Sequence, residues 1–290
     1  MNPIPESVER HADIQLEEPV FIAAFRGWND AGDAATFAAS HLSRVWGGER
    51  IASIDPEEFY DFQAVRPNVH LVDGITREIT WPANEFWAAR TADRDVLLFI
   101  GTEPNLRWRT FSKMIVSEAR RHGVNFVVTL GALLADVPHS RDVPITGTAA
   151  DPALVERLGL TRSGYEGPTG IVGVLHDAFG RERVESASLW AAVPHYLAVT
   201  PNPKASLALV RQASELVGVP APVEDLKRAT SAYEDRVSEI VAADEDVQAY
   251  VTALEERADE IDTSELPSGE ALAAELENFL RQRNQGGDGA

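Results

Sequence analysis

Apolar residues recur with two different periods through the first three quarters of the chain. Residues 19–26 (PVFIAAFR) form a nearly continuous apolar run, which is typical of a buried strand. Residues 30–46 change to a helical period, so a helix is expected directly after this strand. The same reasoning predicts further strands at 49–55, 69–82, 95–101, 125–134 and 187–197, with a turn at Asp73-Gly74 inside the second of these. It also predicts three more helices: from Trp108 to near Gly123, from Pro168, and through 207–217. This alternation predicts an α/β fold with a mostly parallel sheet that helices cover on both faces.

The C-terminal quarter has a different period. After a proline-containing linker at 217–226, a seven-residue repeat runs from Val223 to Ile261, and ten of its twelve positions are apolar. The repeat predicts either one long helix or a helical hairpin broken near Asp244, whose side chain would cap the second helix. A final helix is expected at 268–283.

The apolar stripe of this region needs a surface to cover it. Tyr233, Ile240 and Leu254 lie on the stripe, and we expect them to pack against the α/β domain or a neighbouring subunit and to contribute to oligomerisation. Burying a large apolar side chain is worth about 1.5–3 kcal/mol. The chain is accordingly divided into an N-terminal segment 1–18, an α/β core domain 19–218, a helical C-terminal module 223–283 and a disordered tail 284–290.

Charge and composition narrow the possible partners. The chain has 46 acidic and 26 basic residues, a formal net charge of −20, and 18 acidic against 6 basic residues fall between Val223 and Ala290. Such a field repels nucleic-acid phosphates and anionic lipid. No segment approaches 18 consecutive apolar residues, and the absence of cysteine excludes disulfides and thiolate metal sites. We therefore expect a cytoplasmic protein that binds neither nucleic acid nor membrane.

The glycine-containing junction GWNDAGDAA, which begins at Gly27, follows the first buried strand. It has neither the dinucleotide-binding fingerprint nor the lysine and hydroxyl of a phosphate-binding loop. Asp30 is well placed to cap the following helix by accepting an amide hydrogen bond. The alternative is a surface for a ligand or partner formed by Trp28, Asn29 and Asp30.

A long polar connection, residues 129–149, follows another buried strand. It presents Asp136, His139 and Arg141 within six positions, at the carboxyl end of a strand, where open α/β sheets bind ligands. A histidine and an aspartate together can perform acid–base chemistry near neutral pH, and an arginine can hold a carboxylate or phosphate. The alternative is a structural turn whose charges pair within the chain.

The segment GYEGPTGIVGVL, which begins at Gly164, is a third candidate. Tyr165, Thr169 and Gly170 surround a helix start at Pro168, where free amides can bind an anion. Close packing of the helix on the sheet would require the same small residues. No spacing of histidines or acidic residues indicates a metal site, and no nucleophile motif is present, so neither a metal nor a cofactor is predicted.

Taken in order, these loops and the segment EPNLRWRTFS, which contains Arg107 and Arg109, resemble the proteasome assembly chaperone family in its bacterial branch. The resemblance covers about residues 15 to 218 and extends into the helical C-terminal region. It implies a three-layer αβα sandwich similar to the nucleoside phosphorylase/hydrolase architecture and assembly as a homo-oligomer, with a trimer as the working hypothesis. Eukaryotic and archaeal members of the family escort proteasome α-subunits, so a protein partner, possibly proteasome-related, is implied.

Two functions from different classes follow. The first is a non-enzymatic, oligomeric binding protein of the assembly-chaperone type, for which Trp28, Asn29, Asp30, Arg107, Arg109, His139, Arg141, Tyr165, Thr169 and Gly170 are the candidate ligand- or partner-binding residues. The second is an enzyme or binding protein that acts on a small anionic or nucleoside-like ligand. In that case Asp136, His139 and Arg141 would be the catalytic residues.

Overall fold

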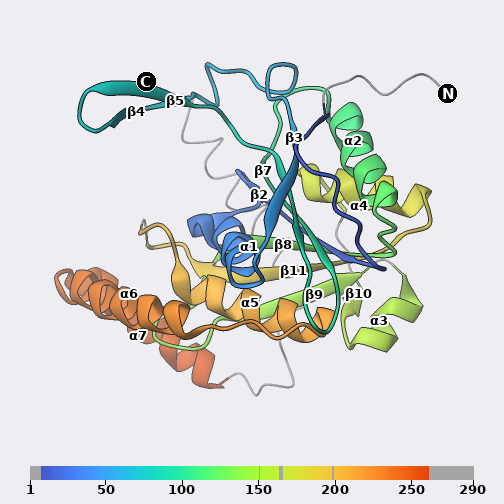
Figure 1. Ribbon diagram of the computed structural model, residues 1–290. Coiled ribbons are helices and arrows are strands. Elements are labelled where there is room, and N and C mark those ends of the chain that lie inside the picture. The colour runs from blue at the N-terminus through green and yellow to red at the C-terminus, as the bar shows by residue number, and fades with distance from the viewer. Residues whose placement is uncertain (1–7, 150, 163–165, 198, 261–290) are drawn as a thin grey trace. The chain divides into compact units, whose positions relative to one another are not determined.

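The computed structural model describes residues 8–149, 151–162, 166–197 and 199–260 (Figure 1). The strands are β1 (Val8–Arg10), β2 (Val20–Arg26), β3 (Glu49–Ile54), β4 (Asn68–Val72), β5 (Thr76–Thr80), β6 (Glu85–Ala89), β7 (Val96–Thr102), β8 (Phe126–Ala135), β9 (Ile145–Ala149), β10 (Thr161–Arg162) and β11 (Glu185–Pro194). The helices are the 3-10 turn η1 (Ala31–Asp33), α1 (Ala34–Val45), α2 (Trp108–Arg121), α3 (Pro152–Leu158), α4 (Ile171–Arg181), α5 (Pro203–Val217), α6 (Glu224–Ala242) and α7 (Glu245–Glu260).

The strand order of the main sheet is β1-β3-β6-β7-β2-β8-β11-β9-β10. β2 and β7 pair in parallel, with Val20 opposite Val96. The outer pairs β1-β3, β3-β6 and β9-β11 are antiparallel. A large central sheet, mostly parallel in its middle and flanked by helices, confirms the predicted α/β fold class of a three-layer sandwich.

The chain divides into two compact units, of which the first comprises residues 1–28, 39–129 and 169–186. Its core is a group of phenylalanine rings: Phe25 lies 5.3 Å from Phe99, and Phe99 lies 4.8 Å from Phe86 in a T-shaped contact. Such pairs add about 0.5–1.5 kcal/mol beyond the area that they bury. α2 buries Phe111 and Ile115 and packs against α4 (Figure 1).

The second unit comprises residues 29–38, 130–168 and 187–290. Asn202 caps α5 by accepting the Ala205 N–H at 3.0 Å, and the Ser206 hydroxyl donates to the Ala34 carbonyl at 2.9 Å, so the start of α1 is held on the start of α5. α5 packs in turn against α6. These contacts link the glycine-containing junction to the helices of this unit.

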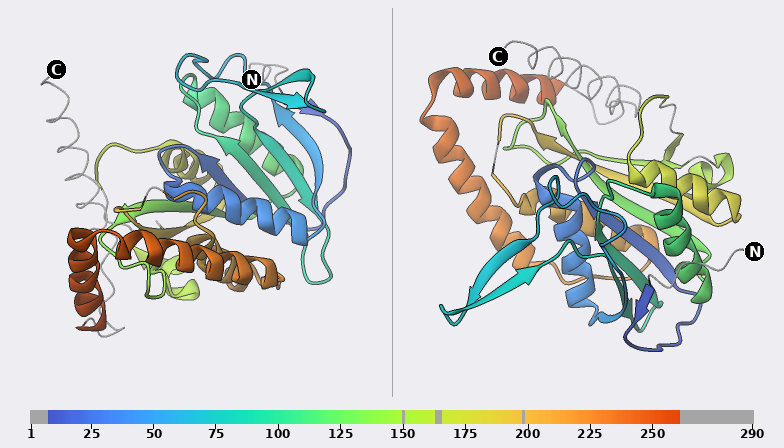
Figure 2. Two further views of the ribbon diagram at one scale, coloured as in Figure 1. Left: turned by 90° about the vertical axis from the view of Figure 1, so that its left-hand side faces the viewer. Right: turned by 90° about the horizontal axis from the view of Figure 1, so that it is seen from above.

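The C-terminal repeat forms two helices, which settles the choice between one helix and a broken one. α6 ends at Ala242, and Asp244 caps α7 by accepting the Asp246 and Val247 N–H groups at 3.0 and 3.1 Å. The two helices meet at a corner (Figure 2). Tyr233 and Val237 belong to a buried cluster in this region.

The buried stripe departs from the seven-residue repeat at its centre. Val241 is buried, whereas Ile240, which was expected to pack against the α/β domain or a neighbouring subunit, is 46% exposed in this chain. A straight α-helix has 3.6 residues per turn and therefore drifts away from a strict repeat of 3.5. Tyr233 and Leu254 are buried within the chain.

Other differences lie in short elements. α4 begins at Ile171 and not at Pro168. β6, β9 and α3 were not predicted, and the connection 129–149 contains the end of β8 and all of β9. β9 (ITGTA) is poor in large apolar residues, which hides it from a periodicity analysis. The predicted helix 268–283 and tail 284–290 lie outside the described residues, and the domain limits stay predictions.

Candidate functional site

The polar loop after β8 is attached to the C-terminal helices. Asp136 accepts a hydrogen bond from the Tyr250 hydroxyl at 2.8 Å and pairs with His195 Nδ1 at 2.9 Å. The rings of His195, Tyr196 and Tyr250 lie within 6.0 Å of one another, centroid to centroid. The carboxylate therefore joins the loop, the end of β11 and α7 in one network.

Arg141 connects the polar loop to α7 at a second place. Its Nε and Nη2 donate to the two carboxylate oxygens of Asp259, each at 2.8 Å, in a bidentate pair, and Ser140 donates to Glu255. The hydrogen bonds from Arg141 lower the pKa of Asp259. The guanidinium that was expected to hold an anionic ligand thus binds carboxylates of the chain itself.

His139 is held by its backbone as well as its ring. The His139 N–H donates to the Tyr196 hydroxyl at 2.8 Å, and that hydroxyl lies 2.9 Å from His139 Nδ1. Because the hydroxyl oxygen accepts the backbone N–H, its own proton is free to donate to Nδ1 of a neutral imidazole. Lys204 donates to the His139 carbonyl at 2.6 Å and pairs with Glu234 of α6 at 2.6 Å. Burial, followed by the charge of Lys204, lowers the pKa of His139, which favours the neutral ring.

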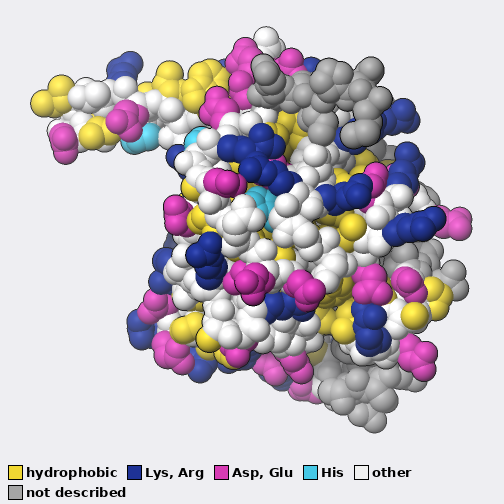
Figure 3. Space-filling model, turned by 45° about the vertical axis from the view of Figure 1, so that its right-hand side comes forward, with side chains coloured by type: hydrophobic (Ala, Val, Ile, Leu, Met, Phe, Trp, Pro, Cys, Tyr) yellow, Lys and Arg dark blue, Asp and Glu magenta, His cyan; other side chains and the backbone are white. Residues whose placement is uncertain are grey.

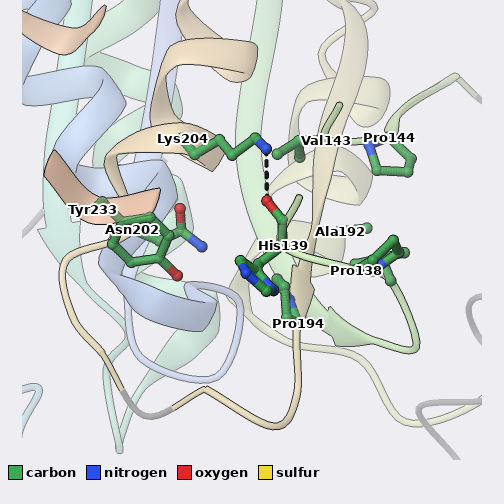
Figure 4. Close-up of a pocket in the computed structure, with 10 residues that line it drawn as sticks. Pro138, His139, Val143, Pro144, Ala192, Pro194, Asn202, Lys204 and Tyr233 are labelled. Carbon is green, nitrogen blue, oxygen red and sulfur yellow. Dashed lines mark hydrogen bonds between the residues drawn. The ribbon is translucent and has the colours of Figure 1, made fainter. Parts of the chain in front are cut away.

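The space beside His139 is too small for an organic ligand. Figure 4 shows Lys204 reaching the His139 carbonyl at a cavity that Asn202 and Tyr233 also line. The cavity volume is about 10 Å³, which is room for about one water molecule. Small-molecule sites usually measure about 300–1,000 Å³. The geometry of Asp136, His139 and Arg141 therefore favours the structural alternative.

Asp30 is also used within the chain. Its Oδ1 accepts the Ala35 N–H at 2.6 Å and the Thr36 N–H at 3.2 Å, and its Oδ2 bonds to the Thr36 hydroxyl. The bonded residues belong to the first turn of α1, although the 3-10 turn η1 lies between them and Asp30 in the sequence. Asp30 is 5% exposed, and burial raises its pKa to about 6. The cap predicted from the sequence is present, with Asn29 buried beside it and Trp28 exposed.

The remaining candidate binding residues lie in the first unit, except for Tyr165, which falls outside the described residues. Arg107 pairs with Glu58, and its guanidinium lies 6.0 Å from the centre of the Phe59 ring. The N–H of Ile171, just after Thr169 and Gly170, donates to Glu103 at 2.8 Å. The chain's own carboxylate thus occupies an amide of the predicted anion site. Arg109 is exposed.

The hairpin β4–β5, which we call the arm (residues 68–80), carries an exposed apolar face. Val69 lies opposite Ile79 and Leu71 opposite Arg77, so these four side chains share one face. Val69, Leu71 and Ile79 are 58–61% exposed, and Ile75 at the tip is 84% exposed. Figure 3 shows hydrophobic side chains along the arm.

The strands of the arm and the Asp73-Gly74 turn were predicted from the sequence, but the arm was not among the predicted sites. The available signal was the alternation of apolar and polar residues within VHLVDGITREITW, which, outside the Asp73-Gly74 turn, only Val72 and Arg77 interrupt. An isolated two-stranded hairpin is marginally stable in water. Its apolar face is therefore a candidate interaction surface.

Two classes of site receive no support from the described residues. None of the helices described in the structure is both long and apolar enough to cross a membrane. Within the same part of the chain, no group of three or more histidine or acidic side chains is arranged to hold a metal ion.

Comparison with known proteins agrees with the fold. No curated protein matches the chain. A crystal structure of a PAC2 family protein from Streptomyces avermitilis is 47% identical, covers 80% of this chain and 99% of its own, and has a TM-score of 0.74. A Mycobacterium tuberculosis proteasome-assembly chaperone homologue is 45% identical with a TM-score of 0.72 and the same coverage.

More distant structures share the fold alone. An archaeal homologue of proteasome-assembly chaperone from Pyrococcus furiosus is 17% identical, covers 87% of this chain and 99% of its own, and has a TM-score of 0.57. The family model described as PAC2 matches residues 24–241, which is most of the chain. The predicted relationship to the proteasome assembly chaperones is therefore confirmed, and the chain belongs to the PAC2 family.

Proposed function

We propose that this protein is a cytoplasmic, non-enzymatic, homo-oligomeric binding protein of the assembly-chaperone type. The observation that carries the proposal is the exposed apolar face of the arm. Exposed apolar surface costs about 25 cal/mol per Å² relative to burial, and contiguous patches mark interaction sites. A protein surface that covers Val69, Leu71 and Ile79 would remove this cost.

The contacts of the polar loop support a non-enzymatic role. A general base must reach a reacting group, and a substrate needs room beside it. His139 lies at a cavity of about 10 Å³, and Asp136 and Arg141 are bonded to α7. The reaction on a small anionic or nucleoside-like ligand is therefore not supported by this site.

The relatives suggest which protein partner to test first. The Mycobacterium tuberculosis structure at 45% identity is named a proteasome-assembly chaperone homologue. Proteasome subunits are accordingly the first candidates. Homo-oligomerisation would involve the C-terminal stripe, where Ile240 is the member of the predicted set that remains exposed.

Affinity capture at native abundance tests the proposal. The tagged protein is expected to retain a protein partner, and Leu71→Ser is expected to lose it, because the substitution removes an apolar side chain from the exposed face. His70→Ser, on the opposite face of the same strand, is the matched control and should retain the partner. Recovery of no partner by the unchanged protein, or equal recovery by Leu71→Ser, would contradict the proposal.

A further inference from the structure

The arm joins a groove that carries mostly negative charge. Trp81 follows β5 directly and lines a groove of about 290 Å³ in the first unit. Glu9, Asp55 and Glu85 are among the residues that line the groove, together with Arg50. We call this feature the acidic groove.

Only some of the charged side chains that line the groove form ion pairs with one another. Arg50 is the basic residue in the lining, and its guanidinium pairs with Glu85 at 2.8 Å. Asp55 accepts the backbone N–H of Glu57. Among the described residues, neither Glu9 nor Asp55 has an ion-pair partner within the residues that line the groove. Within the described lining, the carboxylates of Glu9 and Asp55 are thus available to a cation from a partner.

The junction between the arm and the groove is aromatic. Trp81 is 48% exposed, and its ring packs edge-on against Phe62 at 4.8 Å, which fixes the orientation of the ring. An exposed tryptophan face attracts a guanidinium or ammonium group, and the contact is worth about 0.5–1 kcal/mol at such sites. The apolar face therefore continues into a place suited to a basic side chain.

The backbone of the arm suits an extended ligand. β4 and β5 pair with each other in a separate two-stranded sheet. Three strands are normally needed for a sheet to be stable by itself, so an added strand would stabilise the arm. A strand laid along the arm would place alternate side chains on the face of Val69, Leu71 and Ile79.

We infer that the arm and the acidic groove together bind an extended segment of a partner protein, with apolar residues at alternate positions and lysine or arginine at the end that reaches the groove. This inference rests on the proposed function and names the chemistry of its partner. The apolar side chains pack on Leu71 and Ile79, and the basic side chains meet Trp81, Glu9 and Asp55.

The direct test uses a fluorescently labelled synthetic peptide of about eight residues, long enough to follow β4 at about 3.3 Å per residue. Valines occupy alternate positions, serines lie between them, and two lysines stand at one end. One control peptide replaces the lysines by glutamates, and the other replaces the valines by serines. Fluorescence anisotropy against the full chain is expected to show micromolar binding of the first peptide and at least tenfold weaker binding of each control. Equal binding of all three, or binding of none, would overturn the inference.

Two arm variants separate apolar contact from nonspecific attraction to an acidic protein. Ile79→Asp and Asn68→Asp both add one negative charge to the arm, but Ile79 lies on the apolar face and Asn68 on the opposite face. The inference predicts that Ile79→Asp weakens the peptide at least tenfold, whereas Asn68→Asp leaves the affinity within about twofold. Equal affinities would show that charge alone attracts the peptide and would overturn the inference.

The groove is tested by the double variant Glu9→Gln with Asp55→Asn. Binding of the lysine peptide should weaken several-fold and lose part of its dependence on salt concentration, because screening acts on the removed charges. Unchanged binding and salt dependence would overturn the role of the groove.

Light scattering and affinity capture distinguish this inference from the proposed function. If Ile79→Asp lowers the subunit number and the peptide does not bind, a second copy covers the arm and the inference is wrong. If the peptide binds as expected and native lysate yields no protein partner, the proposed function fails while the peptide-binding surface stands.

Discussion

The polar loop 136–142 and the arm differ in how the chain uses their side chains. The loop has the residue types of an active site, yet Asp136, His139 and Arg141 each bond to other parts of the second unit. The arm has ordinary strand residues, and its apolar side chains remain exposed. The comparison shows that availability of a side chain, and not its chemical reactivity, identifies the candidate interaction surface of this molecule.

The largest expected loss of stability comes from the tyrosine that holds the loop. Tyr196→Ala removes a ring from the cluster with His195 and Tyr250 and leaves the His139 N–H without its acceptor. Ring truncation and an unsatisfied amide together should cost about 4 kcal/mol of unfolding free energy. Denaturant unfolding measures the loss. Tyr196→Phe keeps the ring and should cost only about 1–2 kcal/mol, so equal losses would show that the hydroxyl carries the whole effect.

The next effect concerns Asp30, whose raised pKa makes stability depend on pH. The folded state binds the Asp30 proton more tightly than the unfolded state, because the pKa rises from 3.8 to about 6. The contribution of this group is therefore fully present below pH 4 and is lost as the pH rises through 6. The loss is at most about 3 kcal/mol, since one pKa unit corresponds to about 1.4 kcal/mol.

Asp30→Asn should remove this slope between pH 4 and 6 in denaturant titrations. Asp142→Asn, at an exposed position of the same unit, is the matched control and should leave the slope unchanged. A slope that persists in Asp30→Asn would assign the pH dependence to another group.

A smaller effect is expected at the C-terminal stripe. Ile240→Asp places a charge on an exposed apolar position of α6, so the fold should persist. A subunit contact at this position should weaken. If the contact contributes about 1.4 kcal/mol, the affinity between subunits falls about tenfold. Light scattering across a micromolar dilution series measures the subunit number. Glu239→Asp, at the adjacent exposed position, is the control. An unchanged mass for Ile240→Asp would remove this residue from the proposed interface.

The smallest effect is expected at Arg141. The guanidinium and Asp259 form a solvent-exposed pair, which salt screens, so Arg141→Ala should lower stability slightly at low ionic strength and negligibly at high ionic strength. Captured partners should be the same as for the unchanged protein. If Arg141→Ala loses a captured partner, the polar loop is a binding surface after all.

The long elements of the fold were predictable because their local pattern agrees with their final environment. The spacing of apolar residues predicts the buried strand β2 and the helix α2. The residue types found at helix ends predict the Asp244 cap. α3 had its signals, with Asp151 as N-cap, Pro152 at the first turn and Gly159 at the left-handed C-terminus, but the segment is only seven residues long.

The site was less predictable because it depends on contacts between distant segments. Nothing in the local sequence of the loop indicates that Arg141 meets Asp259, or that Tyr196 meets His139. In the same way, periodicity identifies Val69 and Leu71 as one face of a strand but does not tell whether another element covers that face. Exposure is a property of the tertiary structure.

The most direct test of the comparison measures partner capture and unfolding free energy for Leu71→Ser and Tyr196→Phe in parallel. We predict that Leu71→Ser loses the captured partner while its stability stays within about 0.5 kcal/mol, as expected for an exposed position. Tyr196→Phe should lose stability and keep the partner. If Leu71→Ser keeps the partner and Tyr196→Phe loses it while both remain folded, the interaction surface is at the loop and the account is wrong.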